Sequence, residues 1–153
     1  MEPSNQISLF VPLLVGMAIT FCTVIIHGLM LGFIINRVRR DLRLNRAGVA
    51  FWKDLVIVSG AMMLALAGHL VEMALWALTL ELCGEFSGFA AAFYHSAGSY
   101  TTVGGSSVVI SPRWRLLGPL EASDGMLMFG ISTAMIFAVV QRLLQTRFAR
   151  SGA

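Results

Sequence analysis

The chain has 153 residues, of which 57% are hydrophobic and 12% are charged, and a formal net charge of +3. Its mean hydropathy of +0.79 lies outside the range of soluble globular proteins. The length leaves room for one domain. The composition therefore indicates a small membrane protein and excludes a soluble globular one.

Three apolar stretches are long enough to cross a bilayer as helices, which takes about 20 residues. They are residues 7–35, 55–80 and 125–144. The first lies where a signal peptide would lie, but residues 1–6 contain no Lys or Arg and the apolar run is too long for one. We therefore predict an all-α membrane protein with three transmembrane helices, the first of which is retained.

Basic residues indicate how the chain is oriented in the membrane. Nine of the eleven Lys and Arg residues follow the first or the third span: Arg37, Arg39, Arg40, Arg43, Arg46, Lys53, Arg142, Arg147 and Arg150. Because cytoplasmic segments carry the excess of Lys and Arg, we expect the N-terminus outside and the C-terminus in the cytoplasm. A run of Arg can also bind nucleic acid, but its position beside a span favours the topological interpretation, and no nucleic-acid partner is expected.

The segment between the second and third spans contains a helix of half the usual length. Residues 86–99 read F-S-G-F-A-A-A-F-Y-H-S-A-G-S and have helical spacing, with Ser87 as the expected N-cap. At 1.5 Å per residue such a helix reaches only about 21 Å. It can enter a membrane but not cross it, so we predict a re-entrant helix.

The chain returns from this helix through T-T-V-G-G-S-S, residues 101–107. Non-helical backbone at membrane depth is tolerated only where it is buried in protein or lines a water-filled path. Repeated around a symmetry axis, such a strand would stack rings of carbonyl and Thr hydroxyl oxygens that replace the water shell of a cation. The negative C-terminal end of the short helix also favours a cation. The pattern predicts a cation pathway built from several copies of the chain.

A span, a short helix, T-T-V-G, a short outer linker and a final span resemble the pore module of the potassium-channel superfamily, whose filter reads T-V-G-Y-G followed by Asp. The stretch S-P-R-W-R-L-L-G-P-L-E-A-S-D-G-M-L-M-F-G-I-S-T-A is similar to small bacterial members of this group. The resemblance covers roughly residues 55–144. It implies a homotetramer in the bacterial plasma membrane, in contact with membrane lipids, that passes K⁺ and also Na⁺ without any further cofactor.

On this basis the chain divides into four parts. They are an N-terminal transmembrane helix (1–36), a basic cytoplasmic loop (37–53), a pore domain with outer helix, pore helix, filter and inner helix (54–146), and a short cytoplasmic tail (147–153).

The resemblance assigns roles to residues of the returning strand. Thr102, Val103 and Gly104 match the ion-binding filter, and Thr101 matches the end of the pore helix. These residues are expected to supply the inner oxygen rings of the filter.

The match breaks where the family has Tyr, Gly and Asp, because this chain has Gly105, Ser106 and Ser107. Gly105 and Ser106 occupy ion-binding positions and Ser107 lies at the outer mouth, but none has the matching side chain. The second family glycine adopts a left-handed conformation that costs any other residue about 1–2 kcal/mol. We therefore expect loosened outer rings and weaker discrimination between K⁺ and Na⁺.

Glu72 and His69 lie three residues apart on one face of the second span. A carboxyl group at membrane depth costs about 2.5–3.5 kcal/mol to insert, so it needs a polar partner. We expect Glu72 to hydrogen-bond the pore loop, with Ser99, Tyr100 and Thr101 as candidate partners, and His69 to assist. A buried pair without effect on conduction is the alternative. A metal half-site is a further alternative, disfavoured because no second ligand cluster lies at ligand spacing.

Glu121 and Asp124 precede the third predicted span. Ser123 and Asp124 suit an N-cap there. In a tetramer Glu121 and Asp124 would also place eight carboxylates near the outer mouth and raise the local cation concentration. Both interpretations stay open.

In the third span, Gly130 is placed for a hinge and Phe137 for a gate at the cytoplasmic entrance, although such residues commonly serve packing alone. The sequence contains no nucleophile–base pair, phosphate-binding loop or cofactor motif, so an enzyme is not expected. Two other interpretations of the whole chain stay open. One is a membrane-embedded interaction subunit whose altered filter does not conduct. The other is an intramembrane enzyme or metal site at His69 and Glu72, disfavoured for lack of a second ligand cluster. T-V-G-G-S-S taken alone also fits a flexible outer loop of a non-channel bundle.

Overall fold

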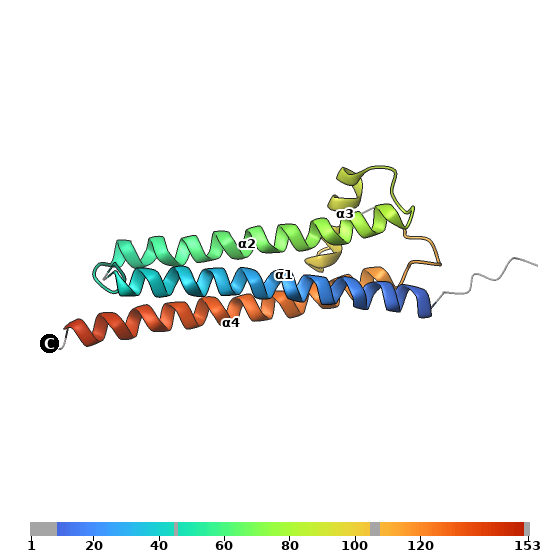
Figure 1. Cartoon of the computed structure of the whole chain (residues 1–153). Helices are drawn as coiled ribbons and strands as arrows, with labels where there is room; N and C mark the ends of the chain where they lie inside the picture. Colours follow the sequence, from blue (N-terminus) through green and yellow to red (C-terminus); the bar gives the residue numbers. More distant parts are fainter. Residues whose placement is uncertain (1–8, 45, 105–107, 152–153) are drawn as a thin grey trace, which may run out of the picture. The chain divides into compact units, whose positions relative to one another are not determined.

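The computed structural model describes residues 9–44, 46–104 and 108–151. Every regular element in these ranges is a helix, which confirms the all-α prediction. The helices are α1 (Phe10–Arg43), α2 (Phe51–Leu82), α3 (Phe89–Tyr100) and α4 (Leu117–Ser151), as Figure 1 shows.

Three of the helices are long and apolar enough to cross a membrane. These are α1, α2 and the part of α4 that runs from Leu117 to Ala149. In their most apolar windows only 17%, 22% and 28% of the residues are buried inside the chain. The other residues of these windows are partly or fully exposed in the single chain, as expected for helices surrounded by lipid or by other membrane-embedded protein.

The helices extend beyond the predicted spans. Residues 44–50 alone separate α1 from α2, so most of the basic connection expected at 37–53 is helical. Arg is a good helix former, and Arg40 and Arg43 lie in the last turn of α1, where the helix dipole favours positive charge. At the other end of the chain, α4 includes most of the expected tail at 147–153.

The described residues form two compact units. Unit 1 comprises those of Met1–Ile26 and Leu70–Met128, and unit 2 comprises those of His27–His69 and Phe129–Ala153. Each of the three long helices contributes one part to each unit, and α3 belongs to unit 1.

Unit 2 has an apolar core and a polar contact around Asp54. The core residues are Ile34, Val38, Ala47, Ala61, Ala65, Val139 and Leu143. The Asp54 carboxylate accepts a hydrogen bond of 2.7 Å from the backbone N–H of Gly48 and forms an ion pair of 2.9 Å with Arg147. Gly48 has a φ of +70°, a conformation that few other residues adopt readily. Asp54 thus joins the 44–50 connection and the end of α4.

Unit 1 places α3 beside α2 and α4. Trp76, Leu80, Tyr100 and Leu117 are completely buried there. A methyl group built on Gly125 of α4 would overlap the carbonyl oxygen of Tyr100, the last residue of α3. The absence of a side chain at Gly125 therefore lets the two helices approach each other, as small residues do in membrane proteins generally.

Two expected helix N-caps are wrong. α3 begins after Gly88, whose backbone is extended (φ −170°, ψ 143°), rather than after Ser87. α4 begins at Leu117, so Ser123 and Asp124 lie inside the helix. Pro119 in the first turn of α4 explains the earlier start, because proline is tolerated where the backbone N–H needs no helical partner.

Gly125→Ala is expected to destabilise the protein by about 1–3 kcal/mol, because the added methyl group must displace α3. The Gly130→Ala change in the same helix is the matched control, since a methyl group there meets no atom within 4 Å. Thermal unfolding in detergent should give a lower midpoint for the first variant and no decrease for the second. Equal midpoints would show that α3 does not pack closely on α4.

Candidate functional site

The candidate site lies in unit 1, where α3 ends. α3 has 12 residues, too few to cross a bilayer at 1.5 Å per residue. Its C-cap is Thr101, whose backbone N–H and hydroxyl both donate to the Ala97 carbonyl, at 3.2 and 2.6 Å. The prediction that Thr101 ends this helix is confirmed.

Beyond Thr101 the chain turns back against α3. The N–H of Thr102 donates to the carbonyl of Ser99, and the N–H of Gly104 donates to the carbonyl of Gly98, each at 2.9 Å. A methyl group on Gly98 would lie 2.5 Å from the carbonyl oxygen of Gly104. Hydrogen bonds and close packing therefore hold this turn on the end of the helix.

The backbone of the turn alternates in handedness. Thr102 has a φ of +62° and Gly104 a φ of +71°, while Val103 between them does not have a positive φ. Glycine adopts this region readily, but a β-branched residue such as Thr does so at a cost of about 1–3 kcal/mol. Such conformations cluster at functional sites, so Thr102 is a candidate for a functional role.

Two carbonyl groups of this segment point away from α3. Because a trans peptide places C=O opposite N–H, the amides that face α3 leave the carbonyl oxygens of Thr101 and Val103 pointing away from it. Val103 is 83% exposed in the single chain. Gly105, Ser106 and Ser107, which the resemblance assigns to the outer filter and mouth, lie outside the described residues.

Glu72 makes the predicted contact with the end of α3. The hydroxyl of Tyr100 donates to the Glu72 carboxylate at 2.5 Å, and both residues are completely buried. Burial raises the pKa of Tyr100 above its usual range, and the neighbouring Glu72 raises it further, so the phenol stays protonated and remains a donor. Tyr100 immediately precedes Thr101, so this bond fixes the start of the turn.

Asp124 is the acceptor of a second buried network. It receives hydrogen bonds from the indole Nε1 of Trp76 at 2.8 Å and from the hydroxyl of Thr23 at 2.8 and 3.0 Å. The network links α1, α2 and α4 within unit 1. Sequence reasoning missed it, although Thr23 is a polar residue in an apolar run, which was an available signal.

Glu121 and Asp124 are both buried, with 0% and 1% exposure. This placement does not favour a role as exposed charges at an outer mouth. Ser123, the other expected cap residue, donates its hydroxyl to the carbonyl of Pro119 inside α4.

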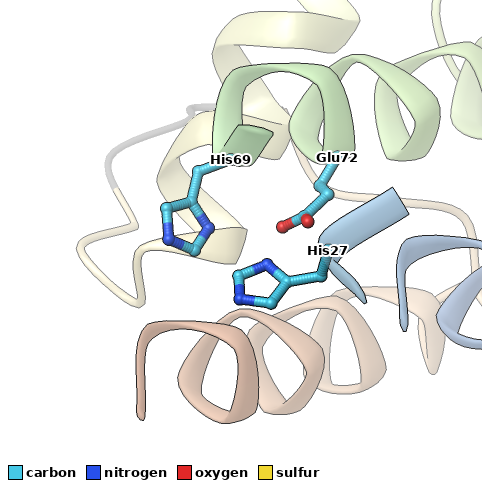
Figure 2. Close-up of side chains that lie close together, drawn as sticks. All are labelled: His27, His69 and Glu72. Carbon is cyan, nitrogen blue, oxygen red and sulfur yellow. The ribbon is translucent and has the colours of Figure 1, made fainter. Parts of the chain in front are cut away.

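His69 lies in unit 2, where it approaches a second histidine that sequence reasoning did not consider. The rings of His27 on α1 and His69 on α2 have centroids 5.3 Å apart, and Figure 2 draws them with Glu72, which follows His69 by three residues on α2. The Nε2 atom of His69 lies 3.1 Å from the hydroxyl oxygen of Ser132 on α4. Assistance of His69 to the pore loop stays a prediction.

The expected hinge and gate lie on α4. The helix continues through Gly130 and Phe137 without interruption. The side chain of Phe137 is 62% exposed in the single chain. A surface position of this kind is available to line a pathway between copies, and both roles stay predictions.

No family model, curated protein or solved structure matches this chain.

His95 is a buried residue of α3. Its ring lies against Phe86 with 5.1 Å between centroids, and neither ring nitrogen has a hydrogen-bond partner among the described residues. Burial disfavours the charged ring and lowers its pKa below the usual value of 6.5.

Acidification is therefore expected to destabilise unit 1 through His95. The unfolded chain binds a proton near pH 6.5 while the folded chain resists it, so folding stability is full above that pH and decreases below it. His95→Leu removes this titration. The unfolding midpoint of the variant should fall less between pH 7.5 and pH 5.5 than that of the unchanged protein. The same pH dependence in both proteins would assign it to other groups.

Proposed function

We propose that the chain is the subunit of a homotetrameric, potassium-channel-like cation channel, which passes monovalent cations along the strand that follows α3. The observation that carries the proposal is the turn Thr102–Gly104, with its alternating backbone. The same alternation that gathers N–H groups on one side of a turn gathers C=O groups on the other. Oxygens collected on one side are suitable ligands for a dehydrated cation.

The position of the turn supports a cation as the ligand. It follows the C-terminus of α3, where the helix dipole places partial negative charge. The N–H groups of Thr102 and Gly104 are bonded to α3, so these two do not compete with the carbonyl oxygens for the space in front of the turn. Anions would find no donors there among the described amides of Thr102 and Gly104.

The buried network behind the turn supports a rigid site. Glu72 holds Tyr100, and Gly125 lets α4 approach the same residue. A site that selects ions must keep its oxygens in place, and residues fixed by packing and hydrogen bonds do so better than a free loop.

A single turn cannot enclose a pathway, so the proposal requires several copies of the chain. The side chain of Val103 is 83% exposed, and a neighbouring copy would cover it. Four copies follow from the resemblance to the potassium channels, and four chains of 16.6 kDa give a complex of about 66 kDa.

Restoring the family signature is expected to increase selectivity. The triple change Gly105→Tyr, Ser106→Gly and Ser107→Asp supplies the second left-handed glycine and the missing aromatic side chain. Reversal potentials of purified protein in bilayers under a K⁺/Na⁺ gradient should show a modest K⁺ preference before the change. The preference should rise about tenfold or more after it, equivalent to about 1.4 kcal/mol.

The control for this experiment is Ser106→Ala with Ser107→Ala, which alters the same segment without restoring the signature. Both variants are compared only as complexes of unchanged mass in mild detergent. An unchanged permeability ratio in the triple variant would contradict the proposed role of this strand. Absence of current in every intact complex would favour the non-conducting interaction subunit.

Glu72→Ala is expected to lower the conductance or open time while the protein still assembles. Removal of the acceptor deprives the buried Tyr100 hydroxyl of its hydrogen bond to Glu72, at a cost of about 1–3 kcal/mol. Glu72→Gln keeps an acceptor oxygen and should have a smaller effect, whereas Tyr100→Phe should resemble Glu72→Ala in single-channel recordings. Unchanged currents in all three variants would mean that the bond serves folding alone.

A further inference from the structure

Two of the three histidines in the chain lie near the middle of membrane-length helices and meet in unit 2. His27 belongs to α1 and His69 to α2, and their exposures are 1% and 3%. The ring planes are tilted by 43° (Figure 2). Polar, ionisable side chains at this depth are costly to insert, so such a pair indicates a function.

Both rings direct the same nitrogen at one hydroxyl. The Nε2 atoms of His69 and His27 lie 3.1 Å and 3.3 Å from the Ser132 oxygen. A hydroxyl has one proton, so it donates to one imidazole and accepts a hydrogen bond from the other. Three helices thus bring two imidazole nitrogens and a hydroxyl oxygen to one point.

We propose that His27 and His69 bind a divalent transition-metal ion such as Zn²⁺, with Ser132 beside it. A ring nitrogen of each histidine lies within 4.8 Å of one in the other. Tetrahedral ligands at about 2.1 Å from a zinc ion are about 3.4 Å apart, so the rings need to approach by less than about 1.5 Å. This approach would come from rotation of the two imidazoles about their side-chain bonds.

The chemistry of the donors decides which ions fit. Neutral imidazole is a good ligand for Zn²⁺, Cu²⁺, Ni²⁺ and Co²⁺ and a poor one for Mg²⁺ and Ca²⁺, which prefer oxygen. Water and the Ser132 hydroxyl complete the coordination.

A groove lies beside the pair. A groove of about 310 Å³ in unit 2 is lined by His69 and Ser132, together with Met62, Phe129 and Ile136. The groove opens to the surface of the single chain beside His69. Bound metal would cross-link α1 and α2 inside unit 2 and stabilise the folded protein by mass action.

The site differs from the metal half-site considered for His69 and Glu72 alone. Sequence reasoning disfavoured that half-site because a second ligand was missing. The fold supplies His27, which is 42 residues earlier in the chain. The inference does not depend on ion conduction, because metal binding is measured without current.

The test uses purified full-length protein without a histidine tag, titrated with Co²⁺ and, separately, with Zn²⁺. We expect one ion per chain, a visible absorption spectrum typical of tetrahedral Co²⁺, and a rise in the unfolding midpoint with Zn²⁺ but not with Mg²⁺. His27→Gln and His69→Gln should each weaken binding by about tenfold or more. His95→Gln is the matched control, because His95 lies in unit 1 and packs on Phe86, and it should bind as the unchanged protein does.

The spectrum of the unchanged protein decides the matter even where a variant fails to fold. Absence of a stoichiometric Co²⁺ spectrum would overturn the proposal and leave the two histidines as a hydrogen-bonded pair with Ser132. Equal loss of binding in His95→Gln would also overturn it, since the ion would then bind elsewhere.

Discussion

The hydrogen bond from Tyr100 to Glu72 is the interaction on which the candidate site depends. It joins the last residue of α3 to the buried face of α2, and the turn that follows begins one residue later. In an apolar environment water cannot replace this hydrogen bond for either group. Breaking the bond therefore costs the folded state free energy. The unusual backbone of Thr102 can persist because the residues before it are fixed in this way.

Polar contacts also hold helices together in unit 2. Lipid is as apolar as leucine, so burial of apolar surface gives helices little reason to associate in a membrane. Close approach and hydrogen bonds must supply the specificity. Asp54 with Arg147, and Ser132 with His27 and His69, provide such bonds, and Gly68 lets α2 pack against Met30 of α1.

The two proposals use different chemistry and separate residues. The turn after α3 offers backbone oxygens, which suit weakly held monovalent ions. The histidine pair offers imidazole nitrogens, which hold transition metals tightly. Each unit therefore has its own set of ligands, and each can be tested while the other is left intact.

Hydropathy and length decide which segments can cross a membrane, so the sequence was sufficient to predict the three apolar helices and the short fourth one. It also located the end of α3 at Thr101 and named Tyr100 among the partners of Glu72, since the resemblance placed the loop beside that span. The start of α4 was predicted too late in the chain. The helix already begins at Leu117, because its first turn tolerates Pro119.

Which distant polar groups meet could not be predicted and depends on how the helices pack. Thr23 and Asp124 are 101 residues apart, and Trp76 and Asp124 are 48 apart. His27 and His69 likewise come from different helices. Helical periodicity tells which residues share a face of one helix but not which faces pack together. That choice depends on shape, on small residues such as Gly125, and on pairing every buried polar group, which are properties of the folded chain as a whole.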